Sequence, residues 1–217
     1  MTDNAVRYGF RAVKSRYGGA NYPVEEAWVA TAASFDVNGG ASNVVLGEGD
    51  PLVQLSDGSV TLAVGSETTD STTILGICVG IKQYYDTVKG VMTALGPGVP
   101  SDLAWGTNLA RQTRIYYVPI ESCIWAIQVD DASTFTTEAT YQAAIGENCR
   151  MVLTGASGEN RAKPKLDIST HATTNTFPFK IVDLSHTAQN QDYSGANVEL
   201  YVISNGTIAS RNAILGI

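Results

Sequence analysis

The chain has no lysine or arginine in the 64 residues from Gly18 to Ile81, although that stretch carries eight acidic residues. Over all 217 residues the formal net charge is −7. Nucleic-acid binding needs a basic stripe that neutralises phosphates, so the body of this protein is not expected to bind nucleic acid. The cations that precede the gap are confined to a short N-terminal segment.

Cysteine is scarce, with three residues separated by 45 and 26 positions. There is no C-x-x-C pair and no histidine cluster near them, which argues against a disulfide framework and against a zinc site. Cys78 and Cys123 lie in apolar strand-like runs and are predicted to be buried. Cys149 follows a predicted helix, and we expect it to be partly accessible.

The sequence lacks long apolar runs and recognisable catalytic motifs. No run approaches the ~18 residues that a membrane span requires, and no secretory leader is evident, so we expect assembly in a cytoplasm without membrane contact. His171 and His186 have no carboxylate or cysteine at metal-ligand spacing, and Asp130-Asp131 is more typical of a turn than of a calcium site. These patterns predict a protein that is not an enzyme and needs no metal or cofactor.

What is present indicates β-structure. Short runs rich in β-branched residues alternate with turn residues, which predicts a mainly β fold, a barrel or a sandwich, with an extended N-terminal arm and one short helix. The helix is predicted at residues 137–145, ended by Gly146. The strands are predicted at residues 44–46, 51–55, 59–64, 73–82, 114–118, 123–129, 150–153, 177–184 and 198–204, with a hairpin turn at Asp57-Gly58.

Four segments are predicted. Residues 1–25 form a basic extended arm, 26–82 a first β lobe, 83–111 a long connection, and 112–217 a second β lobe packed on the first, either as two lobes or as one continuous domain. The connection shows little strand character, and its aromatic residues should contact a partner protein or a sister subunit, or pack back on the protein's own body. These aromatic residues are Tyr84, Tyr85 and Trp105.

The arm alternates cations with aromatic rings and has too few apolar residues for a core of its own. It should therefore be disordered unless it lies against another surface, and its removal should leave the β body folded. Arginine and aromatic residues are enriched at interface hot spots, so a docking role competes with a frayed terminus. The candidate binding residues are Arg7, Tyr8, Phe10, Arg11, Lys14, Arg16 and Tyr17.

The order of several short stretches resembles a family of virion structural proteins of tailed bacteriophages. In the first half these are residues 8–13 (YGFRAV), 49–53 (GDPLV) and 74–80 (ILGICVG). In the second half they are residues 114–118, 125–129, 145–149, 165–170, 181–184 and 195–202. The resemblance covers most of residues 6–208 and is to head decoration, or cement, proteins of short-tailed phages. The tract around Pro97 and Trp105 is longer than the family pattern expects.

The resemblance implies a non-enzymatic protein on the outer capsid surface of the virion that bridges major capsid protein subunits. It also implies self-association, with a homotrimer favoured over a dimer. One alternative is a tail or fibre component that binds host glycan through Trp105, Tyr84 and Tyr85. A second alternative is a hydrolase that uses His186 or His171 with Asp183 or Asp167.

Overall fold

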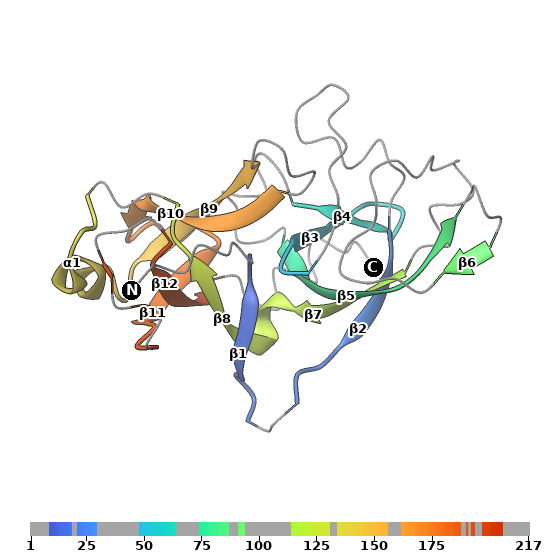
Figure 1. Cartoon of the computed structure of the whole chain (residues 1–217), viewed down its shortest axis with the longest axis horizontal. Helices are drawn as coiled ribbons and strands as arrows, with labels where there is room; N and C mark the ends of the chain where they lie inside the picture. Colours follow the sequence, from blue (N-terminus) through green and yellow to red (C-terminus); the bar gives the residue numbers. More distant parts are fainter. Residues whose placement is uncertain are drawn as a thin grey trace.

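The computed structural model describes residues 9–18, 21–29, 48–63, 74–86, 91–93, 114–130, 134–155, 162–187, 190, 192–193 and 197–205. These residues form two antiparallel β-sheets and one short α-helix, arranged as a sandwich that is not closed into a barrel. The mainly β fold with one helix is therefore confirmed, in its sandwich form. Figure 1 shows one sheet with the helix in the left half of the molecule and the other sheet in the right half.

The first sheet, sheet A, has the strand order β1-β8-β12-β11-β9-β10. Its far strand β10 curls back so that Leu166 forms an isolated bridge with Val129, just after β8. The strands are β1 (Arg11–Ser15), β8 (Cys123–Gln128), β9 (Asn148–Gly155), β10 (Ala162–Ala172), β11 (Phe179–Leu184) and β12 (Glu199–Ser204).

The second sheet, sheet B, has the order β2-β7-β5-β3-β4, with β6 paired to the far end of β5. Its two edges approach each other, because Val29, after β2, bridges to Val60 in β4. Its strands are β2 (Glu25–Trp28), β3 (Pro51–Gln54), β4 (Val60–Leu62), β5 (Ile74–Asp86), β6 (Val91–Thr93) and β7 (Arg114–Pro119). A 3₁₀ turn at Ile120–Ser122 leads from sheet B into sheet A.

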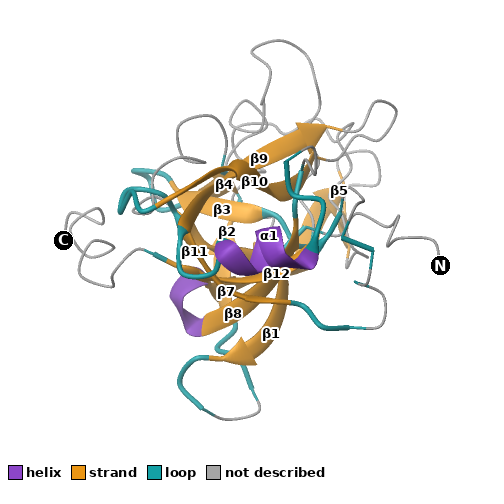
Figure 2. Ribbon diagram, turned by 90° about the vertical axis from the view of Figure 1, so that its left-hand side faces the viewer, coloured by secondary structure: helices purple, strands orange, loops and turns teal. Residues whose placement is uncertain are grey.

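The predicted hairpin and helix are both confirmed. Gly58 has a φ of +82° in the turn between β3 and β4, a conformation that glycine adopts at little cost. Helix α1 (Glu138–Ala143) begins at the N-cap Thr137, whose side chain and that of Thr140 form a reciprocal capping box. Backbone hydrogen bonds of 2.9 Å join Gly146 and Glu147, after the helix, to Ile181 in β11. Figure 2 shows α1 in front of sheet A.

A single cluster of buried side chains extends through both sheets. Trp125 in β8 is fully buried, and its indole N–H donates to the carbonyl of Ile120 at 2.9 Å. Val53, Ile77 and Val118 from sheet B belong to the same cluster as the apolar residues of sheet A. This cluster therefore joins the two sheets, although fully buried residues of sheet B such as Leu52, Leu62 and Ile115 lie outside it.

The N-terminal arm corrects our expectation most clearly. It is not a separate appendage in its described part, because β1 pairs with β8 and Phe10 is buried in the cluster that joins the two sheets. The Phe10 ring lies 4.9 Å from that of Phe179 and 6.3 Å from that of Trp125, centroid to centroid. Gly9, with a φ of +74°, lies so close to Gly49 that an added Cβ would fall 2.7 Å from its carbonyl oxygen.

The sheets also differ from the predicted segments. β7 pairs within sheet B, so the change of sheet comes at residues 120–122 and not near residue 112, while β1 belongs to sheet A. The predicted strand at 73–82 continues to Asp86 and pairs with β6, so the start of the tract 83–111 is strand and not loop. Strands β1, β2, β6 and β10 were not predicted, and the strand predicted at 44–46 lies outside the described residues.

Candidate interaction surface

Described residues 11–18 and 21–28, here called the β1–β2 ribbon, gather most of the exposed cationic and apolar side chains. Within the described part of the chain, four lysines or arginines are exposed, and three of them lie in the ribbon: Arg11, Lys14 and Arg16. Five large hydrophobic side chains are exposed there, and four belong to the ribbon: Val13, Tyr17, Val24 and Trp28. In Figure 1, β1 and β2 descend to a connection that protrudes from the lower side of the molecule.

The predicted arm residues therefore differ in how far they are buried. Phe10 is core and is not available as a contact residue in this structure. Lys14, Arg16 and Tyr17 are exposed, with Tyr17 at 65%. Arg7 and Tyr8 lie outside the described residues.

Arg11 fixes the start of the ribbon to sheet A. Its guanidinium donates to a carboxylate oxygen of Glu199 at 2.9 Å, and the Glu199 side chain is only 4% exposed. The Ser185 hydroxyl donates to the other Glu199 oxygen at 2.6 Å. Asn190 bonds the backbone of Glu199 in both directions. A buried carboxylate held by several partners makes a rigid anchor.

β2, at the other end of the ribbon, is held by surface charges. Glu26 accepts from Lys82 at 2.5 Å and from Arg114 at 3.4 Å. The hydrogen bond from Lys82 is the main reason that the pKa of Glu26 lies below its usual value. The guanidinium of Arg114 also lies 3.8 Å from the centre of the Trp28 ring, a stacking contact that leaves Trp28 40% exposed.

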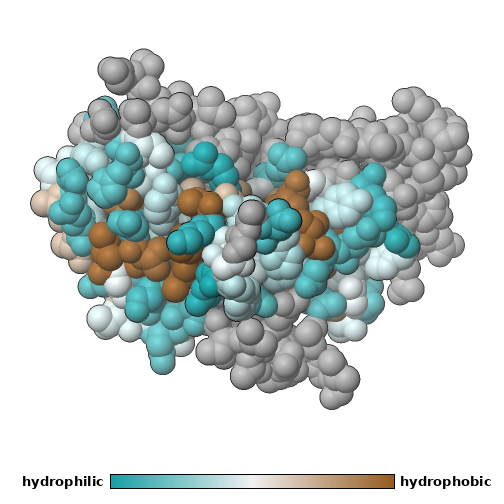
Figure 3. Space-filling view, turned by 90° about the horizontal axis from the view of Figure 1, so that it is seen from below, coloured by the Kyte–Doolittle hydropathy of each residue, from teal (hydrophilic) through white to brown (hydrophobic). Residues whose placement is uncertain are grey.

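The outer face of sheet A adds apolar surface beside β1. Its partly exposed apolar side chains are Ile124 in β8, Val182 in β11, and Tyr201 and Ile203 in β12, the strand in which exposed and buried positions alternate. Figure 3, seen from below, shows one hydrophobic patch in the left half, the half that holds sheet A in Figure 1, and a second patch to the right of centre. An apolar face flanked by cations has the composition of a protein-binding surface.

The other predicted contact residues are only partly placed. Tyr84 and Tyr85 lie in β5, where they pair with Thr93 and Met92 of β6. Trp105 lies outside the described residues. Sequence reasoning missed Val13, Val24 and Trp28, although a tryptophan soon after two glutamates in a short edge strand is a usable signal of exposure.

The three cysteines are all free and buried, which confirms the prediction for Cys78 and Cys123. The expectation that Cys149 is accessible is wrong, because its exposure is 0%. Burial, aided by the carboxylates of Asp167, Glu147 and Asp130, raises the pKa of the Cys149 thiol to about 12. A thiol that stays protonated at neutral pH is a poor nucleophile.

The candidate polar chemistry around α1 is sparse. His171 lies 3.8 Å from a carboxylate oxygen of Glu147, and its ring contacts Phe135 edge-on. Asp130 accepts from the backbone N–H of Ile168 at 3.3 Å. Among the described residues, no group of three or more His, Cys, Asp or Glu side chains is placed to hold a metal ion. No helix in that part of the chain is long and apolar enough to cross a membrane.

Comparison with family models, with curated proteins and with solved structures found no match for this chain.

Proposed function

We propose that the protein is a non-enzymatic virion structural protein that binds the outer surface of a phage capsid and bridges major capsid protein subunits. The observation that carries this proposal is the concentration of exposed cations and hydrophobic side chains in the β1–β2 ribbon of an otherwise acidic chain. The resemblance of the sequence to head decoration proteins is the reason for proposing the major capsid protein as the partner.

The ribbon suits this task because its ends are fixed and its middle is exposed. Arg11 and Phe10 hold one end in sheet A, and the pairing of β2 with β7 holds the other end in sheet B. A contact surface that is ordered before binding loses less conformational entropy when the partner arrives. Tyr17 and Val24 supply apolar contact area, and Lys14 and Arg16 supply attraction to a carboxylate-bearing shell.

The proposed stabilisation of the shell comes from the surface area that the protein buries against the capsid subunits. A protein that spans two capsid subunits adds contacts that must break before the subunits separate. We also propose that it acts as a homo-oligomer, with a trimer favoured over a dimer, because repeated weak contacts to a lattice give strong retention. The acidic remainder of the surface would then face solvent and keep the particle soluble.

The test is rebinding of the purified chain to phage capsids from which the protein has been stripped. Binding on the order of hundreds of copies per particle is the expected result, since a repeating lattice offers many equivalent sites. Saturation at roughly a dozen copies would instead indicate a tail position, where copy numbers follow tail symmetry. Absence of binding to capsids would refute the proposal.

A further inference from the structure

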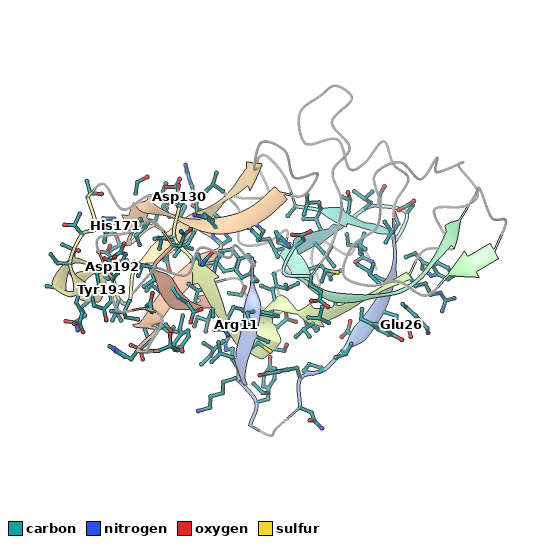
Figure 4. All side chains as sticks on the ribbon, in the orientation of Figure 1. Arg11, Glu26, Asp130, His171, Asp192 and Tyr193 are labelled. Atoms are coloured by element: carbon teal, nitrogen blue, oxygen red, sulfur yellow. The ribbon has the colours of Figure 1, made fainter. Side chains whose placement is uncertain are left out.

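Trp28 and Ile145 are exposed hydrophobic side chains in different halves of the molecule, and neither lies in the described connection between β1 and β2, residues 16–18 and 21–24, here called the ribbon tip. Trp28 is 40% exposed in β2 of sheet B, and Ile145 is 38% exposed just after α1. Figure 1, in which the longest axis is horizontal, shows α1 at the far left and β2 with β7 in the right half. Figure 4 likewise separates Glu26 from His171, Asp192 and Tyr193.

The surface around Trp28, here called the Trp28 face, consists of Trp28, Glu26, Lys82 and Arg114. One carboxylate, Glu26, serves both cations, so these four side chains carry a net charge of +1. The neighbouring Glu25 points to the other side of the strand, where its carboxylate accepts from the buried Tyr117 hydroxyl. An aromatic ring stacked under a guanidinium, with excess positive charge, is suited to an acidic partner with an apolar contact.

The other surface, here called the α1 end, consists of Glu138, Gln142 and Ile145. These residues recur at spacings of four and three, so they form one exposed stripe, while Tyr141 and Ala144 on the other side are buried. In the helix and the residues that follow it, Glu138 and Glu147 are acidic and no lysine or arginine occurs before Arg150, while the exposed Lys180 of β11 pairs with Asn148 nearby. The Glu138 carboxylate lies near enough to Tyr193 to contribute, after burial, to the raised pKa of that phenol.

We propose that the α1 end of one copy docks on the Trp28 face of a second copy of this chain. The Trp28 face carries excess positive charge and the α1 stripe carries Glu138, and each surface exposes a large hydrophobic side chain. Because the two surfaces differ and lie in different halves of the molecule, the contact is head-to-tail, and its repetition closes a ring if the rotation permits. The lower side, with the ribbon tip, remains free for the shell. This inference rests on the self-association proposed above.

The test uses one variant at each end. Glu138→Lys with Gln142→Lys reverses the charge of the α1 end, and Trp28→Glu places an acid in the Trp28 face. Each variant alone should be monomeric by size-exclusion chromatography with light scattering at tens of micromolar, whereas the unmodified chain is oligomeric. Repulsion in the α1-end variant, and loss of the attraction and of the Trp28 ring in the other, should each raise the dissociation constant by roughly tenfold or more.

Mixing the two variants in equal amounts restores a single native contact, between the α1 end of the Trp28→Glu chain and the Trp28 face of the other. The mixture should therefore form a dimer of twice the 23.0 kDa chain mass and nothing larger. Lys14→Glu, an exposed charge reversal in β1 outside both surfaces, is the matched control and should leave the oligomer intact. If either end variant fails to fold by circular dichroism, Ile145→Glu or Lys82→Gln replaces it.

A monomeric unmodified chain, end variants that stay oligomeric, or a mixture that stays monomeric would each overturn the head-to-tail contact. Shell binding is measured separately with the Glu138→Lys, Gln142→Lys variant, whose β1–β2 ribbon is unchanged. If this variant is monomeric and still binds capsids, both proposals are upheld. A chain that forms rings but binds no capsids upholds this contact and refutes the proposed function.

Discussion

Phe10 and Tyr17 are aromatic residues seven positions apart in the same N-terminal segment, but the first is buried and the second is exposed. Phe10 is 4% exposed and packs on Trp125 and Phe179, whereas Tyr17 is 65% exposed. Between them, Arg11 is paired with buried Glu199 while Lys14 is exposed. The segment thus divides into an anchoring half, residues 9–11, and a presenting half, residues 13–17.

This division explains how a short segment can display the proposed binding surface without the disorder expected of a polar terminus. The anchoring half contributes to stability through burial, whereas the exposed side chains of the presenting half, Val13, Lys14, Arg16 and Tyr17, contribute little. Changes in the two halves should therefore affect different measurements.

The largest effect is expected from Phe10→Ala. Loss of a fully packed ring leaves a cavity between the two sheets, which should lower the free energy of unfolding by about 3–5 kcal/mol. Urea denaturation followed by tryptophan fluorescence measures this change. Tyr17→Ala, the matched aromatic change in the presenting half, should shift stability by less than about 0.5 kcal/mol. Equal losses from the two variants would contradict the division.

For the same reason, deleting residues 1–17 is a poor test of binding, contrary to what the sequence suggested. The deletion removes strand β1, the Phe10 ring and the partner of Glu199 together. It should destabilise the body, so a loss of binding would not show which residues make the contact.

A smaller effect is expected from Arg11→Ala. Glu199 would keep the Ser185 hydroxyl but lose its cation in a nearly buried site. Because Arg11 itself is half exposed, the loss should be about 1–2 kcal/mol and not the roughly 3–5 kcal/mol of a fully buried pair. A double-mutant cycle with Glu199→Gln measures the coupling, and a coupling near zero would show that the ion pair does not anchor the segment.

The buried thiol of Cys149 predicts an alkaline dependence of stability. Its pKa rises from an ordinary 9.0 to about 12 in the folded protein, so between these values the unfolded chain loses a proton that the folded chain keeps. Stability should therefore fall as pH rises from about 9 towards 12. Cys149→Ala should reduce this slope, which pH-dependent melting measures. Rapid labelling of Cys149 by a thiol reagent in the native protein would contradict its burial.

The sequence predicted those elements whose signals are local. The helix has a threonine cap at Thr137 and a glycine after it, and the β3–β4 hairpin has Asp57-Gly58 at its turn. Each of these signals acts over a few residues and needs no knowledge of distant partners. Short runs rich in β-branched residues similarly located most of the central strands.

The strands that were missed depend on position within the sheets. β10 contains Lys163, Pro164 and Lys165, which indicate a loop, yet proline is tolerated there because β10 is an edge strand. β2 is short, acidic and mostly exposed, as edge strands often are. β1 depends on contacts of Phe10 and Arg11 with residues more than one hundred positions away, which no local pattern reveals.

Only part of the candidate surface could be predicted from the sequence, because local patterns do not reveal long-range packing. The cation-rich composition of the arm correctly indicated that Lys14, Arg16 and Tyr17 face outward. The sequence could not separate them from Phe10, since both kinds of residue alternate in the same short segment. Only the long-range packing on Trp125 and Phe179 assigns Phe10 to the core.

The most direct test of the presenting half as a contact surface compares shell affinity and stability for Lys14→Glu with Arg16→Glu. Stability should change by less than about 0.5 kcal/mol, because both side chains are exposed. Affinity for stripped capsids should fall roughly tenfold or more, since reversed charges now repel a carboxylate-bearing shell, and the loss should shrink as salt screens charges beyond about 8 Å. Ser56→Glu, which adds an acid in the exposed turn between β3 and β4, should bind as the unmodified chain does. Unchanged capsid affinity in the double variant would contradict the assignment of the presenting half as the contact surface.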